Sequence, residues 1–473
     1  MTAPTSLAPR TRPTPLRSLG WLLPLAAALT ACTTLRPPAQ VTPATPTSWQ
    51  APLPHEGQLQ QLTNWWARTN DPVLVALIES AQRISPSLAQ ARSRVEQARA
   101  TQTTARAALL PTLDAQASAS RGVTPPVTTP ATTAQAGLQA GWEIDLFGAN
   151  QATRDAATER LAGAQALWHE ARVSVAAEVA LQVSSLRTCL QQLDVAERDA
   201  QSRAATARLT QDSQRAGFTA PATAALASAS AAEATARAAQ QRMQCDVDFK
   251  TLVALTGEPE PALRNQITTA PVPGFDEARF TIAALPVQVL SQRPDVYNAE
   301  REVAAASAEV GSAQAQRWPR LSLTGTVGTA WSSAAGTTTD LSTWSFGPLA
   351  LSLPLLDGGR RTAQVDAARA RYDEAVAVYQ GRVRQAVSEV EQALVRLQST
   401  AERADSARAA VQGYRTSFDA TEARWRGGLA SLVELEDARR TALAAENALI
   451  ALQHERQTAW IALYRAAGGG WKL

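Results

Sequence analysis

Residues 134–147 read AQAGLQAGWEIDLF, a stretch in which apolar and polar side chains alternate. Leu138 and Trp142 fall on one face, and Gln139 and Glu143 fall on the other. A period of two predicts a β-strand with one apolar face and one polar face. A tilted membrane strand needs about 9 to 11 residues, so this stretch is long enough to cross an outer membrane.

Three further strands are predicted from similar patterns, at about 112–122, 320–331 and 341–356. The loops that join them in pairs, at 122–133 and 332–340, are polar and rich in small residues. A soluble sandwich strand would alternate in the same way, and this alternative stays open. Four strands cannot close a membrane barrel, because the smallest such barrels have about eight. Membrane strands would therefore require copies of the chain to share one barrel, and three copies would supply twelve strands.

Each strand pair is followed by a long helical pattern. One predicted helical hairpin spans about 150–256 with its turn at Gly217, and the other spans about 359–466 with its turn at Gly427 and Gly428. A helix of about 65 residues would be about 98 Å long. Such helices need neighbours along their whole length, and alanine-rich sequences allow neighbouring helices to approach closely.

The order of helix, strand pair and helical hairpin occurs twice. Pro111 and Pro319 are 208 residues apart, and Gly217 and Gly428 are 211 residues apart. These residues lie at matching junctions, which indicates an internal duplication. The predicted organisation is a first repeat at 61–264, a linker at 265–294 and a second repeat at 295–473.

The first 31 residues are a predicted signal peptide. Arg10, Arg12 and Arg17 precede an apolar run at 19–29. This run is roughly half the ~20 residues that a membrane-spanning helix needs. The pattern therefore favours a cleaved secretory signal over a retained transmembrane helix.

The end of the leader, Leu-Thr-Ala-Cys at 29–32, resembles the bacterial lipobox. The resemblance implies that Cys32 is diacylated and becomes the first residue of the mature chain. Thr33, in place of aspartate, implies the outer membrane. A lipidated tether at 32–60, rich in Pro and Thr, would then follow. An incidental cysteine after an ordinary signal peptide is the alternative.

Two further cysteines, Cys189 and Cys245, each lie 28 residues from Gly217. If Gly217 marks the turn of an antiparallel hairpin, both thiols lie about 42 Å from the turn. A disulfide is then possible in an oxidising periplasm. Two buried free thiols are the alternative.

Composition argues against several classes of function. The chain has 45 basic and 42 acidic residues, and removing the three leader arginines leaves 42 of each, so nucleic acid is not an expected partner. No histidine pair of the zinc-protease type, no phosphate-binding loop and no Gly-x-Ser-x-Gly elbow occurs. We therefore expect neither an enzyme nor a cofactor, and transport energy would have to come from a partner.

Taken together, these segments resemble the TolC-like outer-membrane efflux proteins, in the lipoprotein branch that pairs with resistance-nodulation-division pumps. The resemblance covers essentially the whole mature chain. Its specific pieces are Trp65-Trp66, Asp71-Pro72, WEIDLFG at 142–148, RPDV at 293–296, LPLLDGGR at 353–360 and GGGW at 468–471.

The resemblance implies a mainly α-helical protein with a membrane β-barrel part. It implies a homotrimer with a twelve-stranded barrel in the outer membrane and an α-helical barrel that crosses the periplasm. The partners would be a periplasmic adaptor protein, docked at the hairpin turns, and an inner-membrane pump. The function would be a passive, gated exit duct for drugs or other small toxic compounds. A metal-ion efflux duct, a type I secretion duct and a lipid-anchored periplasmic coiled-coil scaffold are the alternatives.

Relatives in this family close the duct with acidic side chains of the second hairpin. Counted from the turn glycine, Glu434 and Asp437 match these acidic positions, and a spacing of three residues places them on one helical face. In a trimer they would form a ring of six carboxylates that favours cations and attracts a divalent blocker. Arg426 is a further candidate for a gate contact. The alternative is a solvated helix face on which Arg439 and Arg440 are the partners of these acids.

Overall fold

A computed structural model describes residues 36–46, 49–51, 65–123, 129–269, 290 and 293–470. The predicted signal peptide and Cys32 lie outside the described residues. The chain forms two compact units, one containing the four strands and the other containing most of the helices. The strand unit is made of Met1–Ala39, Gln102–Ala157 and Ala304–Tyr372, and the helical unit of Gln40–Thr101, Thr158–Val303 and Asp373–Leu473.

The four strands form one antiparallel sheet in the order β1-β2-β3-β4. The loop predicted at 332–340 is shorter than expected, because the strands continue to a two-residue turn. Ala335 and Gly336 both have positive φ in this turn, at 50° and 83°, which suits the twist of a two-residue hairpin. The strands are β1 (Thr112–Gly122), β2 (Ala131–Ile144), β3 (Arg320–Ala334) and β4 (Thr337–Ser352).

The apolar residues of the strands come together on one face of the sheet. Leu138, Val327 and Trp344 stand opposite one another in a row across three strands. A register shift at Leu323/Gly325 keeps the leucines at the end of β4 on the same face as Trp344 and Phe346. The side chains of Trp344 and Phe346 are 80% and 82% exposed. The sheet therefore presents a continuous apolar surface that nothing in the chain covers in the described structure.

The opposite face of the sheet is polar. The side-chain amide of Gln116 donates to Gln139 at 3.1 Å, and the hydroxyls of Thr326 and Ser345 are 2.7 Å apart. Within the described sheet, β1 and β4 each pair along one edge only. One chain therefore leaves two open sheet edges.

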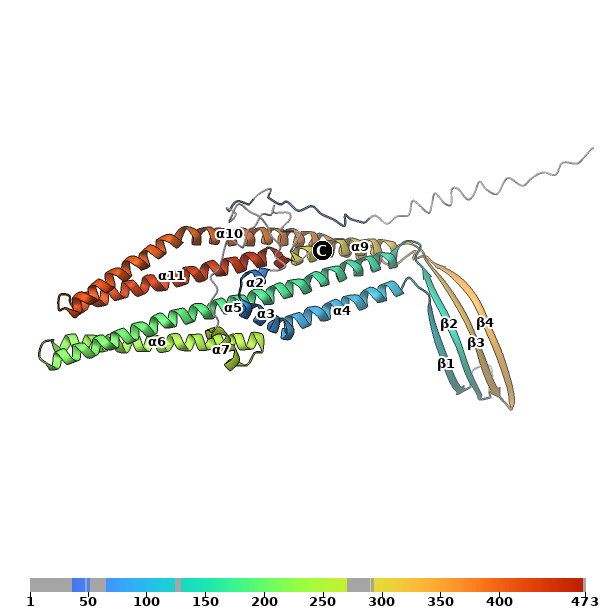
Figure 1. The fold of residues 1–473 in the computed structure, drawn as a ribbon. Coiled ribbons are helices and arrows are strands. Elements are labelled where there is room, and N and C mark those ends of the chain that lie inside the picture. Colours follow the sequence, from blue (N-terminus) through green and yellow to red (C-terminus); the bar gives the residue numbers. More distant parts are fainter. Residues whose placement is uncertain are drawn as a thin grey trace, which may run out of the picture. The chain divides into compact units, whose positions relative to one another are not determined.

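The helices repeat with the spacing that the sequence predicts (Figure 1). The helix before each strand pair has 22 residues, and the first helix of each hairpin has 67 residues, about 100 Å at 1.5 Å per residue. The predicted duplicated unit is confirmed. The paired helices are α4 (Pro86–Ala107) with α9 (Pro294–Ala315), α5 (Ala149–Arg215) with α10 (Arg360–Arg426), and α6 (Pro221–Thr256) with α11 (Leu432–Ala466).

Short helices pack against the long ones in the helical unit. The sequence did not predict α7, which crosses the expected boundary between the first repeat and the linker. No described helix is both long enough and apolar enough to span a membrane. The short helices are α2 (Trp65–Arg68), α3 (Pro72–Ile84), α7 (Glu260–Thr269) and the 3₁₀ turn η4 (Gly468–Gly470).

Two sequence motifs, Asp71-Pro72 and RPDV at 293–296, link short helices and helix ends to the long helices. Asp71 caps α3 by accepting a hydrogen bond from the amide of Leu74 at 3.1 Å, and it also pairs with Arg187 of α5. The buried Arg293, just before α9, pairs with Glu389 of α10 at 2.7 Å and donates to the carbonyl oxygen of Ala466, the last residue of α11, at 3.2 Å. Each motif joins a short helix or a helix end to a different long helix.

A disulfide joins Cys189 of α5 to Cys245 of α6, with their Cα atoms 5.5 Å apart. Both cysteines are buried among Leu186, Phe249 and neighbouring apolar side chains. The bond links the two helices of the first hairpin across 56 residues of chain.

We expect the double variant Cys189→Ala/Cys245→Ala to unfold at lower denaturant concentration than the parent protein. Closing a loop of this length lowers the entropy of the unfolded chain, which stabilises the fold by about 4 kcal/mol in the chain-entropy model. The measurement is the unfolding midpoint of the helical circular dichroism signal. A reductant should lower the midpoint of the parent and leave that of the variant unchanged. Equal midpoints for oxidised parent and variant would contradict the expectation.

Candidate functional site

The two hairpin turns are built alike. Gly217 and Gly428 have φ values of 82° and 72°, which L side chains rarely adopt. The next amides, those of Phe218 and Leu429, each donate at 2.8 Å to a carbonyl oxygen five residues earlier. This is the Schellman ending of a helix. Gly427, the third predicted turn glycine, still donates within the last turn of α10, to the carbonyl oxygen of Ala423 at 3.1 Å.

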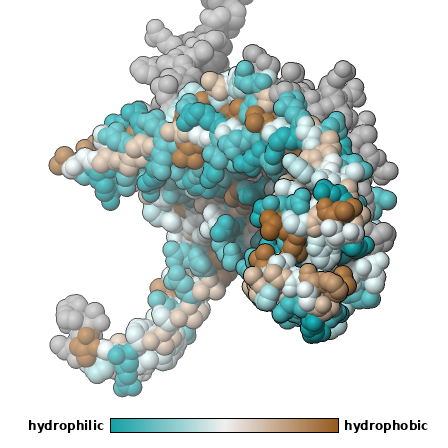
Figure 2. All heavy atoms as spheres, turned by 90° about the vertical axis from the view of Figure 1, so that its left-hand side faces the viewer, coloured by the Kyte–Doolittle hydropathy of each residue, from teal (hydrophilic) through white to brown (hydrophobic). Residues whose placement is uncertain are grey.

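A large apolar side chain follows the left-handed glycine in both turns. Phe218 is 86% exposed and Leu429 is 74% exposed. Figure 2 views the molecule from the side on which the turns lie and shows hydrophobic residues set among mostly hydrophilic ones. Exposed apolar side chains thus occupy equivalent positions in the two hairpin turns.

Glu434 begins α11 as part of a capping box. The backbone amide of Ser431 donates to the Glu434 carboxylate at 2.7 Å, and the Ser431 hydroxyl accepts from the Glu434 amide at 3.2 Å. Glu434 is nevertheless 53% exposed. The hydrogen bonds from the Ser431 backbone and side chain lower the pKa of Glu434. Its carboxylate is therefore fixed in place and charged at neutral pH.

Asp437 lies on the same face of α11 and is 59% exposed. It pairs with Arg440, one of the two arginines that the solvated-face alternative proposed as partners. Arg439, the other one, lies elsewhere. The two acids that the sequence singled out are thus brought together, half-exposed, at the start of the second helix of the hairpin.

The predicted gate residue Arg426 pairs with Glu422 of its own helix at 3.1 Å. Arg424, which was not predicted as a gate residue, is better placed for contact with Glu434. Its guanidinium donates to the carbonyl oxygen of Leu429 at 3.1 Å and lies 3.9 Å from the carboxylate of Glu434. Arg424 therefore spans the turn between α10 and α11.

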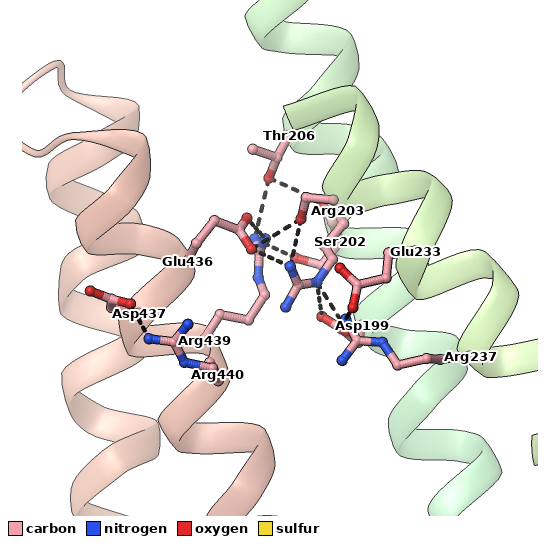
Figure 3. A network of polar contacts seen from close by, with 11 residues as sticks. Asp199, Ser202, Arg203, Thr206, Glu233, Arg237, Glu436, Asp437, Arg439 and Arg440 are labelled. Carbon is pink, nitrogen blue, oxygen red and sulfur yellow. Dashed lines mark hydrogen bonds and ion pairs between the residues drawn. The ribbon is translucent and has the colours of Figure 1, made fainter. Parts of the chain in front are cut away.

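Arg439 points to the opposite side of α11 and is only 2% exposed. Its guanidinium donates to Glu436 at 2.6 Å, and to the hydroxyls of Ser202 and Thr206 on α5, both at 3.2 Å (Figure 3). The ring of Phe418 of α10 lies 5.5 Å from the guanidinium carbon. One arginine thus connects both hairpins.

A second buried arginine completes the connection from α5. Arg203 pairs with Asp199 at 2.9 Å and with Glu436 of α11, and it donates to Ser230 of α6 at 2.5 Å (Figure 3). We call Asp199, Arg203, Glu436 and Arg439 the buried charge network. No local sequence pattern predicts this network, because a charged residue on a helix is usually exposed to solvent and nothing nearby in the chain marks it as buried.

Comparison with known proteins agrees with this architecture. The family model described as "Outer membrane efflux protein" matches residues 77–258 and 285–469. Outer membrane protein OprJ of Pseudomonas aeruginosa is 30% identical over 426 residues, which cover 88% of each chain. The solved structure of the outer-membrane channel OprN has 27% identity and a TM-score of 0.81, covering 93% of this chain and 99% of that one. The open-state MtrE channel of Neisseria gonorrhoeae has 26% identity and a TM-score of 0.76, covering 92% and 98%. Each matched segment contains one of the two sets of helix, strand pair and long helical hairpin, and the chain belongs to the outer membrane efflux protein family.

Proposed function

We propose that the protein is the outer-membrane exit duct of a tripartite efflux system, passive and gated at its periplasmic end. The observation that carries this proposal is the sheet with one exposed apolar face and two open edges, continuous in sequence with helical hairpins about 100 Å long. Such a sheet suits a bilayer, and such hairpins suit a passage across the periplasm. The family is one of channels and not of enzymes.

The duct is a homotrimer in this proposal. Three four-stranded sheets would pair β1 of one copy with β4 of the next and close a barrel of twelve strands. Closure satisfies every backbone donor and acceptor at the sheet edges. The same symmetry would place six helical hairpins around one axis.

A coiled-coil scaffold fits the chain less well. It would use the long helices, but it has no use for rows of exposed Trp, Phe and Leu on a sheet whose opposite face is polar. In water such a face would promote aggregation.

The proposed cargo is small toxic organic compounds. The chain has two methionines and three histidines, few of the soft and imidazole ligands that a metal-ion duct could use. Export of a folded or unfolded protein shares the same architecture, and it stays the second transport alternative. Energy would come from an inner-membrane pump of the resistance-nodulation-division type, through a periplasmic adaptor.

A lipid anchor at Cys32 is part of the proposal. Residues 36–38, which follow Cys32 in the chain, contact other parts of the strand unit. Arg36 pairs with Asp155 at 3.3 Å, and the carbonyl oxygens of Pro37 and Pro38 accept hydrogen bonds from the hydroxyls of Ser307 and Tyr372. Four residues span at most about 14 Å, so the acyl chains would enter the membrane close to Asp155, near the start of α5.

The adaptor would dock at the two turns through Phe218 and Leu429. We expect Phe218→Asp and Leu429→Asp each to abolish most drug export in cells that make the pump and the adaptor, because a charge replaces an apolar contact that becomes buried. The measurement is drug susceptibility together with the amount of protein in the outer membrane. Leu226→Asp, on the exposed side of α6, is the matched control and should export normally. Normal export by both turn variants would rule out docking through these side chains.

The gate would be formed by Glu434 and Asp437 of three copies, six carboxylates in a ring. Arg424 would steady the turn from which this ring projects. Because the pKa of Glu434 is lowered, its charge would persist below the usual pKa of a glutamate. Such a ring would bind divalent cations and hinder anions.

We expect Glu434→Gln/Asp437→Asn to weaken block by a divalent cation at least about tenfold, since removing several close charges removes on the order of 1 kcal/mol or more each. Glutamine can still complete the capping box, so the variant tests charge and not helix formation. The measurement is single-channel conductance in planar bilayers with added divalent cation. Glu402→Gln/Asp405→Asn, two exposed acids with the same spacing on α10, is the control. Unchanged block in the gate variant would refute the ring.

A further inference from the structure

Charged residues lie on two opposite faces of α11. At 3.6 residues per turn, Glu434 and Asp437 are about 60° apart, and so are Glu436 and Arg439. The centres of these two pairs are about 160° apart around the helix. The first pair is half-exposed, whereas in the second pair Arg439 is buried against α5 and the side chain of Glu436 is only 17% exposed.

The contacts of the buried pair determine how α11 can rotate. Arg439 reaches Ser202 and Thr206, which are four residues apart on α5, while Glu436 reaches Arg203 between them. Three neighbouring positions on α5 thus meet two positions on α11. Turning α11 about its axis by one residue, about 100°, would break all of these contacts at once.

Rotation would also leave charges without partners. The network has two arginines, one aspartate and one glutamate, and its net charge is zero. Arg439 is 2% exposed, and Asp199 and Arg203 are each 8% exposed or less. A buried charge separated from its partner costs several kcal/mol. The orientation of α11 in which all four charges are paired is therefore strongly preferred over orientations rotated by one residue. Leu432 and Leu435, buried on the same side of α11, favour the same orientation through apolar contacts.

We propose that the buried charge network positions the gate: by fixing the rotation of α11 against α5, it holds Glu434 and Asp437 on the face turned away from α5. Glu436 and Arg439 are positioning residues that do not touch the cargo. This inference rests on the proposed gate for its functional meaning, but its structural content, the orientation of α11, can be tested separately.

The test variant is Glu436→Ala/Arg439→Ala, which keeps a good helix former at both positions and adds no large apolar side chain that could hold α11 in the same orientation. It removes both α11 members together and leaves Asp199 and Arg203 paired on α5, so no single charge is stranded. The structural readout is the rate at which a charged thiol reagent labels Leu435→Cys, because Leu435 is fully buried in the parent orientation. Cys189 and Cys245 are bonded to each other, and the protein without the added cysteine gives the background rate.

We expect the rate to rise at least about tenfold in the test variant, because α11 loses the contacts that hold Leu435 inward. The matched control is Arg198→Ala/Glu446→Ala, which removes another α5–α11 ion pair of 2.7 Å, but one in which Arg198 is half-exposed. It should label like the parent, since an exposed pair contributes little. A test variant that is folded by circular dichroism and still protects position 435 would overturn the inference.

The functional readout is divalent block, which the test variant should weaken although Glu434 and Asp437 are both present. A role in stability alone would not change block in channels that are folded and conducting. Arg439→Lys covers the case in which the double variant does not fold. Lysine keeps a cation beside Glu436 but lacks the second guanidinium nitrogen, which donates to Ser202 and Thr206. The labelling rate of this variant should be intermediate. If labelling rises while Glu434→Gln/Asp437→Asn leaves block unchanged, the gate proposal fails and the orientation of α11 by the network stands. A rate for Arg439→Lys equal to that of the parent would overturn the network's role.

Discussion

The outer edges of β1 and β4 carry backbone amide and carbonyl groups for which the described sheet offers no partner. In water such groups bind solvent, but at bilayer depth each one left unpaired costs several kcal/mol. The exposed apolar face that includes Trp344 and Phe346 is stable in a bilayer and not in water, whereas unpaired backbone groups at the sheet edges are not stable in a bilayer. One chain satisfies both demands only by sharing its sheet with copies of itself. Assembly is thus a condition for the membrane part of this fold, and a symmetric duct follows from it.

The long helices meet a related requirement by different means. The hydrogen bonds within α5, a helix of 67 residues, do not by themselves keep it stable in water, so the helix depends on packing against neighbours along its length. Alanines line much of α5, among them Ala176, Ala177 and Ala180, all almost fully buried, and they let the neighbouring helices come close. Large aromatic side chains gather where α2 meets α11, as in the contact of Trp65 with Trp460 at 6.1 Å between ring centroids. The core is thin along the hairpins and thicker where short helices cover them.

Charged residues of the same types serve different purposes on α11, according to burial. Asp437 and Arg440 form a mostly exposed pair, which contributes little to stability and leaves the carboxylate accessible to ions. Glu436 and Arg439, one residue earlier in each case, are buried against α5, where a broken pair is expensive. In the proposed duct, the first arrangement suits contact with permeating ions, and the second suits the alignment of helices.

Much of this protein was determined by local sequence alone. Alternation with period two located four strands, and the glycines located both hairpin turns, because these signals depend on residues near one another in the chain. The duplication was revealed by matching residues such as Pro111 and Pro319, which share a local junction although they are 208 residues apart. The capping box of Ser431 and Glu434 was not predicted, although its local signature, a serine three residues before a glutamate, is present in the sequence. Tertiary structure decided which of the adjacent Arg439 and Arg440 is buried. That choice depends on Ser202 and Thr206, more than two hundred residues away, and on packing between helices that no local pattern records.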